Sequence, residues 1–201
     1  EIGNIVLLHD ITELTRTMQE RERLIGALKN TQSELEVLAT TDALTSLFNR
    51  RFFYQEAEQE FERSARYQRP LSVIMLDVDH FKRINDHHGH AVGDQILCAI
   101  ADTLKGSVRN VDLLARFGGE EFIVLLPETG QPEALCLAER ILNRVKACAV
   151  LYEGKRIATT ISAGIASIGE DAGSLEGLIR RADAALYQAK EKGRDRICLS
   201  G

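Results

Sequence analysis

Two aspartates that follow an apolar run are the first candidates for chemistry in this chain. Asp77 and Asp79 come after the run Val73-Ile74-Met75-Leu76, which is typical of a central strand. Residues two apart in a strand share one face, so we expect both carboxylates to emerge together where the strand ends. Paired hard oxygen ligands suit Mg²⁺. Acidic residues at strand ends also cap helices or meet solvent, so the pair alone is weak evidence.

A second acidic cluster follows two adjacent glycines. Gly118-Gly119 lies between two apolar runs, residues 113–117 and 120–126, and this pattern predicts a tight hairpin. Glycines let a ligand approach the backbone closely, and Glu120 at the start of the second strand can reach across to a metal held by the first cluster. One or two carboxylates plus substrate phosphates make the usual Mg²⁺ site of phosphoryl chemistry. A glycine pair is equally ordinary hairpin chemistry.

Three basic side chains could hold phosphates beside these acids. Lys190 and Arg194 are one helical turn apart near the end of a predicted helix, and Lys82 comes just after the acidic strand. Cations at such places also offset the helix dipole in ordinary proteins. For each residue taken alone, this ordinary structural role is the better reading.

Interleaved helices and strands must position these side chains. We expect helices at about 50–67, at 92–104, after Pro132 and at 174–192. We expect strands at 71–79, 113–117, 120–126, on both sides of the Glu153-Gly154 turn, at 159–166 and near Ile197. Because the glycine hairpin makes part of the sheet antiparallel, the fold class is α+β.

The first 41 residues have a different pattern. Residues 5–8 form a short apolar run that predicts a strand, and a polar-rich stretch without proline then predicts one long helix to Thr40. Within it, four leucines follow the alternating four and three spacing of a coiled-coil seam: Leu24, Leu28, Leu35 and Leu38. A parallel dimeric stalk is the favoured interpretation. A single amphipathic helix packed on its own domain is the alternative.

Composition limits the classes of function. With 201 residues, 44% of them hydrophobic, the chain can bury one good-sized core and carry an appendage. The net charge of −5 gives no broad reason to hold a nucleic-acid polymer, although a local basic cluster could bind one nucleotide. No apolar run approaches the roughly 20 residues of a membrane span, and there is no signal-peptide pattern.

Cysteine usage indicates a reducing compartment. The four cysteines are widely spaced without a C-x-x-C pair, and we expect them to be buried reduced thiols: Cys98, Cys136, Cys148 and Cys198. The expected location is therefore the cytoplasm. Because the chain begins at Glu1 without a methionine, we expect it to be a fragment, with any membrane contact made through a missing upstream region.

Five motifs, in order over residues 41–200, resemble the GGDEF family of diguanylate cyclases. They are DALTSLFNRR at 42–51, DVDHFKRIND at 77–86, Gly89-His90 with Gly93-Asp94, RFGGEEF at 116–122, and ADAALYQAKEKGR at 182–194. The resemblance implies a palm-like core related to nucleotide cyclases and polymerases, with a mostly antiparallel central sheet flanked by helices. It also implies an enzyme that condenses two GTP molecules into cyclic di-GMP and releases two pyrophosphates, with Mg²⁺ or Mn²⁺ as cofactor.

Site residues carry over from the family by position. The implied metal ligands are Asp77, Glu120 and the Val78 carbonyl. The implied contacts to guanine are Asn85 and Asp94, and those to the phosphates are Lys82, Lys190, Arg194 and the main-chain amides at His80 and Phe81. The catalytic residues would be Glu120, Glu121 and Lys190, with Glu121 a candidate base on the ribose hydroxyl.

The physical requirements of the reaction agree with this set. Attack of a ribose 3′-hydroxyl on an α-phosphate needs a metal to lower the pKa of the hydroxyl and cations to stabilise the charge on the phosphates. Each domain would bind one GTP, so two domains must face each other. The resemblance thus implies a homodimer, which the N-terminal helix would hold together.

Arg109-Asn-Val-Asp112 resembles the inhibitory R-x-x-D motif of the family, and Arg140 is assigned to the same site. Arginine can pair bidentately with phosphate or guanine, and aspartate can accept from guanine amino groups. Product feedback inhibition by cyclic di-GMP is therefore expected.

Two departures from the family pattern and one histidine cluster remain. Ser46 stands where the family commonly has glycine, and Asp195 where it often has asparagine. Four histidines near the acids raise the question of a transition-metal site: His80, His87, His88 and His90. Their spacing fits no zinc pattern, which favours a structural or solvent-exposed role.

Two rival functions belong to other classes. One is a catalytically inactive GGDEF-like receptor for cyclic di-GMP or GTP. Such receptors usually have a damaged signature, whereas this sequence keeps four key residues: Asp77, Glu120, Lys190 and Arg194. The other, a purely structural dimerisation protein, explains the stalk and leaves the acids unexplained.

The predicted organisation has three parts. Residues 1–11 are the remnant of an upstream sensor that resembles the exit of a PAS domain, and 12–41 are a signalling helix. Residues 42–201 are the cyclase domain. The chain is cytoplasmic, either by itself or as the cytoplasmic part of a larger membrane-bound sensor.

Overall fold

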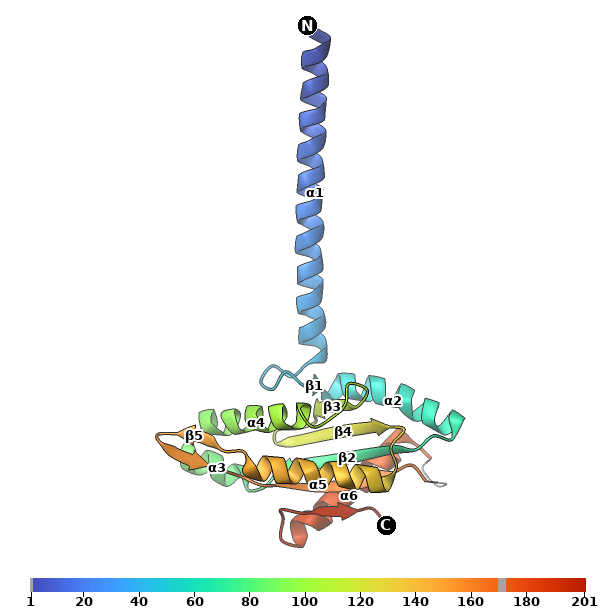
Figure 1. The fold of residues 1–201 in the computed structure, drawn as a ribbon, viewed down its shortest axis with the longest axis vertical. Coiled ribbons are helices and arrows are strands. Elements are labelled where there is room, and N and C mark those ends of the chain that lie inside the picture. Colours follow the sequence, from blue (N-terminus) through green and yellow to red (C-terminus); the bar gives the residue numbers. More distant parts are fainter. Residues whose placement is uncertain (1, 170–172) are drawn as a thin grey trace. The chain divides into compact units, whose positions relative to one another are not determined.

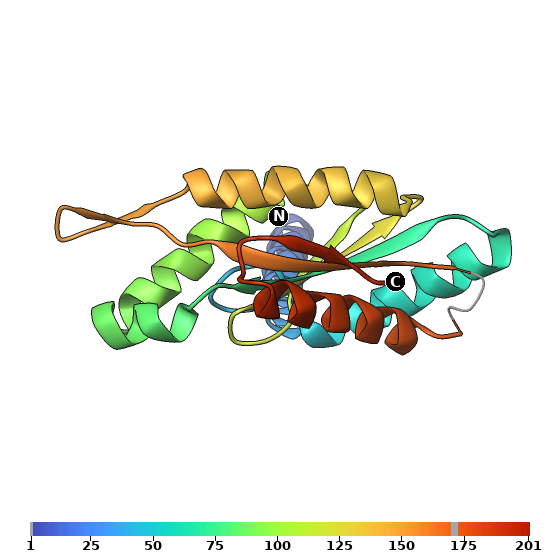
Figure 2. The ribbon, with the colours of Figure 1, turned by 90° about the horizontal axis from the view of Figure 1, so that it is seen from below.

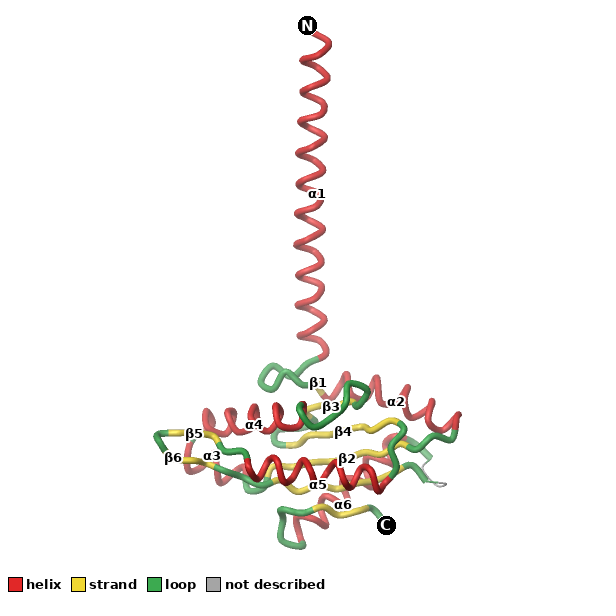
Figure 3. The backbone as a smooth tube through the Cα atoms, viewed as in Figure 1, coloured by secondary structure: helices red, strands yellow, loops and turns green. Residues whose placement is uncertain are grey.

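The computed structural model describes residues 2–169 and 173–201, and the side chains of α1 at 16, 18–32 and 35–40. Two compact units make up the chain, Glu1–Thr40 and Thr41–Gly201. Figure 3 shows that the second unit interleaves helices and strands. This agrees with the α+β class predicted from the sequence.

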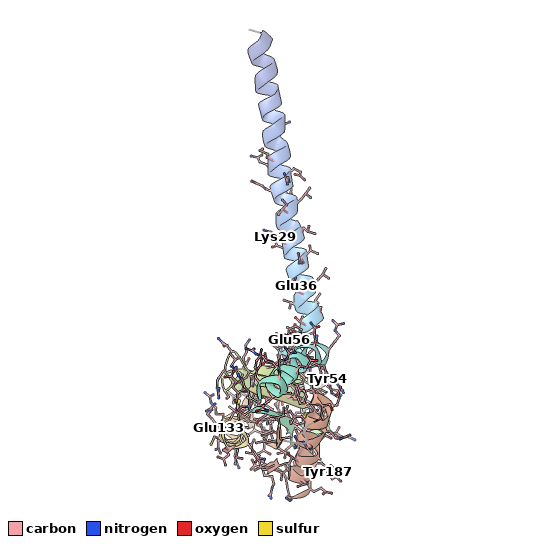
Figure 4. The ribbon with its side chains drawn as sticks, turned by 90° about the vertical axis from the view of Figure 1, so that its right-hand side faces the viewer. Lys29, Glu36, Tyr54, Glu56, Glu133 and Tyr187 are labelled. Atoms are coloured by element: carbon pink, nitrogen blue, oxygen red, sulfur yellow. The ribbon has the colours of Figure 1, made fainter. Side chains whose placement is uncertain are left out.

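The first unit is one helix, α1 (Ile2–Thr40). The strand predicted at residues 5–8 is wrong, because the helix runs through them without interruption. A four-residue apolar run with no turn residue after it continues as readily in a helix as in a strand. Side chains project from both sides of α1 in Figure 4, where Lys29 and Glu36 are labelled.

The four seam leucines of α1 are between 60% and 72% exposed, so their apolar surface is available to another chain: Leu24, Leu28, Leu35 and Leu38. Within the described ranges, none of the helices combines the length and the hydropathy that crossing a bilayer requires.

The second unit contains five helices and eight strands among its described residues. The helices are α2 (Arg50–Tyr67), α3 (Phe81–His88), α4 (His90–Lys105), α5 (Gln131–Ala147) and α6 (Leu175–Glu191). The strands are β1 (Phe48–Asn49), β2 (Leu71–Val78), β3 (Leu113–Arg116), β4 (Glu121–Pro127), β5 (Val150–Tyr152), β6 (Lys155–Ile157), β7 (Ile161–Ser167) and β8 (Ile197–Leu199). Every element predicted for this unit is confirmed within a few residues, and α3 and the short strand β1 are additions.

Six strands form the central sheet in the order β1-β3-β4-β2-β7-β8 (Figure 1). The three inner pairs are antiparallel, whereas β1 with β3 and β7 with β8 are parallel. Strand β2 is buried along its whole length, as a central strand should be. The predicted mostly antiparallel sheet is therefore confirmed.

Helices cover both faces of this sheet, as Figure 2 shows. Alternate residues of β2 divide between the two cores: Leu76 packs in the cluster with α3, α4 and α5, and Met75 in the cluster with α2 and α6. Because Asp77 has the same parity as Met75, its side chain belongs to the α2 and α6 face.

Helix α6 lies unusually close to strand β7. A side chain at Gly164 of β7 would collide with the backbone of Ala182 and Leu186 in α6. The helix begins at an N-cap, where the Ser174 side chain accepts a hydrogen bond from the Gly177 N–H at 3.1 Å. The glycine thus lets α6 approach the sheet, and the far end of α6 carries Lys190.

All four cysteines are free, but the expectation of buried thiols holds for one of them. Cys198 is buried, Cys98 and Cys148 are half-buried, and Cys136 is exposed on α5. Cys136 lies on the outer face of α5, and the apolar pattern of the sequence did not indicate this exposure.

Candidate active site

The C-terminal end of strand β2 and the glycine turn meet at one end of the sheet. Asp77 is paired in register with Glu121 of β4, and the Val78 N–H donates to the Glu120 carbonyl at 3.2 Å. The turn is longer than predicted, because β3 ends at Arg116 and β4 begins at Glu121. Glu120 therefore belongs to the turn rather than to the strand, beside the end of β2.

Lys190, in the last turn of α6, is paired with Asp77. Its Nζ lies 2.7 Å from Asp77 Oδ2, and the two side chains are 30% and 8% exposed. Arg194 follows the end of α6 in a left-handed conformation, φ 64°, and its positive charge acts on Asp77 as well. The structure thus brings together an acid and two bases predicted from the sequence.

Both candidate metal acids have a pKa raised above the ordinary value. Burial raises the pKa of Asp77, and the Asp79 charge adds to this, while Lys190 and Arg194 oppose it. Burial also raises the pKa of Glu120, with a further contribution from the Asp77 charge. Two carboxylates whose negative charges disfavour each other are a donor set that a divalent cation would stabilise.

Asp79 lies near Asp77 at the end of β2, as expected, but its side chain is held by hydrogen bonds within the fold. Its side chain accepts hydrogen bonds from the Thr160 and Ser162 hydroxyls, at 2.6 and 2.7 Å, and from the Asp195 N–H at 3.0 Å. Asp79 is 2% exposed. It ties the end of β2 to β7 and to the loop that carries Arg194.

Helix α3 starts directly after the acidic strand. His80 turns the chain in a left-handed conformation, φ 58°, Phe81 is buried and Lys82 is exposed. The first N–H groups of a helix have no acceptor within it, so those of α3 can bind an anion. The structure therefore places Lys82 and the main-chain amides at one helix start.

Asn85 and Asp94 lie on the neighbouring helices α3 and α4. Asn85 Oδ1 is buried and has no hydrogen-bond partner, and a side chain at Gly93 would collide with it. Asp94 is exposed one residue further along α4. A buried carbonyl oxygen without a donor calls for a ligand that supplies one.

The predicted inhibitory residues gather around the loop after α4. The Arg109 N–H donates to Asp112 Oδ2 at 2.7 Å, and Arg140 of α5 donates to the Ser107 carbonyl at 2.9 Å. Asp112 is 8% exposed, and its Oδ1 has no hydrogen-bond partner. Among the described side chains, Asp112 Oδ1 and Asn85 Oδ1 are the two buried polar atoms without a partner.

Sequence reasoning missed the role of Arg116. Its guanidinium donates to both oxygens of Asp42, at 3.0 and 3.2 Å, and to the Gly119 carbonyl at 2.7 Å. Burial alone would raise the pKa of Asp42, but hydrogen bonds from Thr45 and Arg116 lower it below its ordinary value. Arg116 therefore connects the turn after residue 41 to the glycine turn. Asp42 and Arg116 are the first residues of the motifs at 42–51 and 116–122, and this position was the only sign of their role in the sequence.

Glu121 and the histidines lie beside this centre. Glu121 packs against Gly118 and lines a cavity of about 380 Å³ with Arg50 of α2 and Arg180 of α6. His80, His87 and His88 line another of about 410 Å³. No group of three His, Cys, Asp or Glu side chains in the described part of the chain could hold a metal ion by itself. A cation at Asp77 and Glu120 would need further oxygens, such as substrate phosphates.

Comparison with known families gives one match, which covers most of the chain. Residues 39–196 match the family described as the diguanylate cyclase GGDEF domain. Diguanylate cyclase A of Treponema denticola is 38% identical over 195 residues, 96% of this chain and 53% of that protein. Response regulator PleD of Caulobacter vibrioides is 36% identical over 190 residues, 94% of this chain and 42% of that protein. The chain spans about half the length of these relatives.

Solved structures agree with the family match. The GGDEF domain of DgcB from Caulobacter crescentus, in complex with c-di-GMP, has a TM-score of 0.78 and 32% identity, over 81% of this chain and 96% of that one. The coiled coil and GGDEF domain of the same protein has a TM-score of 0.85 and 28% identity, over 92% and 98%.

Proposed function

The chain belongs to the GGDEF family, and from that premise we propose that it condenses two GTP molecules into cyclic di-GMP and releases two pyrophosphates. The observation that carries this proposal is the convergence of Asp77, Glu120 and Lys190 at one end of the sheet. Acids for a metal and a cation for phosphates meet there, as phosphoryl chemistry requires. The reaction would take place in the cytoplasm, where GTP is available.

Asp77, Glu120 and the Val78 carbonyl would hold Mg²⁺ or Mn²⁺. When bound, the ion supplies Lewis acidity that lowers the pKa of the attacking ribose hydroxyl and neutralises phosphate charge. The raised pKa values of both carboxylates support the assignment, because a cation removes their repulsion. Lys190 would then exchange Asp77 for a phosphate oxygen. Glu121, next to this set, is the candidate base on the ribose hydroxyl.

The remaining substrate contacts divide between phosphates and guanine. Lys82, Arg194 and the amides of His80 and Phe81 would bind the phosphates, because these groups are donors beside the metal acids. Asn85 and Asp94 would bind guanine, whose N–H groups supply the donor that Asn85 Oδ1 lacks. A purine with an N1–H and an amino group fits this requirement, and adenine, which has no N1–H, fits it less well.

Two domains must meet to close the product ring, and α1 would bring them together. Its four seam leucines have the heptad spacing of a parallel dimer and are largely exposed. A GGDEF structure described with its coiled coil, that of DgcB, resembles this chain over 92% of its length. We assign 12–41 as a signalling helix and 1–11 as part of an upstream sensor, although α1 shows no change of secondary structure at residue 11.

Cyclic di-GMP would also bind at Arg109, Asp112 and Arg140 and inhibit the enzyme. The partnerless Asp112 Oδ1 supports this, since guanine can donate to it. The DgcB domain that resembles this chain was crystallised in complex with c-di-GMP.

Turnover of GTP with Mg²⁺ tests the proposal in three variants. Asp77→Asn and Glu120→Gln should lose at least a hundredfold in rate, as expected when a charge-stabilising group is removed. Asp102→Asn, an exposed acid on α4, serves as the matched control and should keep the parent's rate. A parent that binds cyclic di-GMP yet never consumes GTP would establish the receptor function instead.

A further inference from the structure

A small cavity adjoins the loop after α4, away from the metal acids. Its volume is about 210 Å³, and three segments of the chain line it. Lys105 and the loop around Arg109 and Asp112 form one side, and Leu114 of β3 contributes to the wall. The remaining side is the turn before β1, with Ser46, Leu47 and Phe48.

The lining of this cavity combines three kinds of group. Asp112 contributes a buried carboxylate oxygen without a donor, and Lys105 and Arg109 contribute positive charge. Leu47, Phe48 and Leu114 contribute apolar surface. A planar base that carries N–H donors and is linked to a phosphate satisfies all three, which describes a guanine nucleotide.

Ser46 is the unexpected member of this lining. Its φ is 55°, in the left-handed region that side chains other than glycine seldom adopt. The Ser46 N–H donates to the Asp42 carbonyl at 2.9 Å, which holds the turn in this conformation. Glycine, which the family commonly has here, would adopt the turn without strain. A serine in this place keeps the strain and adds a hydroxyl to the cavity wall.

We propose that Ser46 and Lys105 are ligand-contacting residues of this cavity, and that they bind the ribose-phosphate part of cyclic di-GMP while Asp112 and Arg109 bind its guanine. The inference rests on the proposed function, because the ligand is the proposed product. A ligand held this way touches the same turn that Arg116 connects to Gly119 of the signature. The contact therefore extends the inhibitory site from one loop to two.

Calorimetric titration of the full chain with cyclic di-GMP, without GTP, tests this assignment. Lys105→Ala removes a charged donor and should weaken binding about tenfold, and Ser46→Gly removes a neutral one and should weaken it roughly threefold. Lys155→Ala, an exposed lysine of β6 outside the cavity, is the matched control and should bind as the parent does. Thermal melting of each variant checks the fold. Ser46→Gly should melt at or above the parent temperature, because it relieves backbone strain.

Weaker binding in a variant that melts no lower than the parent supports a ligand contact rather than a structural role. Equal affinity of parent, Ser46→Gly and Lys105→Ala overturns the inference. A parent that makes cyclic di-GMP but does not bind it when titrated also overturns it, and leaves the proposed activity standing. If the parent binds cyclic di-GMP through Lys105 but consumes no GTP, the proposed activity is overturned and the binding site stands.

Discussion

Lys190 Nζ lies 2.7 Å from Asp77 Oδ2, so an ion pair joins the last turn of α6 to the end of β2. These residues are 113 apart in sequence (190 − 77 = 113). The pair keeps the proposed phosphate-binding cation and the proposed metal-binding acid together in a structure without ligands. On ligand binding, a metal ion would replace Lys190 as the counter-ion of Asp77, and a phosphate would replace Asp77 as the counter-ion of Lys190. Neither side chain would need to move far.

Because the pKa of Asp77 is raised, replacing its carboxylate with a neutral group should stabilise the folded protein by an amount that depends on pH. A folded-state pKa above the unfolded one means that stability is lost as the pH rises through the folded value, and is fully present below the unfolded value. Asp77→Asn mimics the protonated acid and can still accept from Lys190. Without metal, it should melt above the parent at pH 7, by roughly 2–4 °C for each kcal/mol relieved.

This difference in melting temperature should shrink toward zero as the pH falls to about 4, the ordinary range of an aspartate. Melting curves between pH 4 and 8 in a chelating buffer measure it, with Asp102→Asn as the control. A variant that melts below the parent at pH 7 would show that the carboxylate stabilises the fold.

Gly93→Ala should damage GTP binding while the fold survives. The added methyl group would collide with Asn85 Oδ1, the end of a side chain that can move aside, and with the Phe81 ring edge. Displacing Asn85 would remove the proposed guanine contact, so the KM for GTP should rise about tenfold. Gly169→Ala, with open space around the new methyl group, is the control. An unchanged KM would remove Asn85 from the guanine site.

Arg116→Lys should slow turnover without weakening substrate binding. Lysine cannot donate to both Asp42 oxygens and the Gly119 carbonyl at once, so the glycine turn loses its support. Small displacements of reacting groups cost about tenfold to a hundredfold in rate. Steady-state kinetics should show a lower kcat at a similar KM. Arg69→Lys, in an exposed pair with Glu128, should behave as the parent.

The stalk should dimerise through its leucine seam. Leu28→Asp with Leu35→Asp places charges on that seam, so the variant should sediment as a monomer, and its turnover per domain should fall. Asn30→Asp, an exposed position off the seam, adds a charge without this effect. A double variant that remains dimeric would place the dimer contact elsewhere.

Local patterns predicted most of the second unit. Helix α2 begins and ends at the predicted residues, because the Asn49 side chain caps its first turn and Pro70 follows its end. Helix α3 was missed, since its start at His80 carries no side-chain cap. The strand at residues 5–8 was mistaken because a short apolar run does not separate the two periodicities.

The site shows where sequence reasoning stops. Asp77 and Asp79 have the same residue type and the same strand parity, yet one faces Lys190 and the other is enclosed by β7. The difference depends on Ser162, which is 83 residues away from Asp79. Such partners follow from the order of strands in the sheet, and no local pattern encodes them.

The most direct test of the central claim is the identity and stoichiometry of what the protein makes from GTP. The full chain, incubated with GTP and Mg²⁺, should yield cyclic di-GMP, identified by mass, with two pyrophosphates released for each molecule formed, and Glu120→Gln should yield none. A dimeric parent that leaves GTP intact, or that forms a cyclic mononucleotide with one pyrophosphate, would contradict the account.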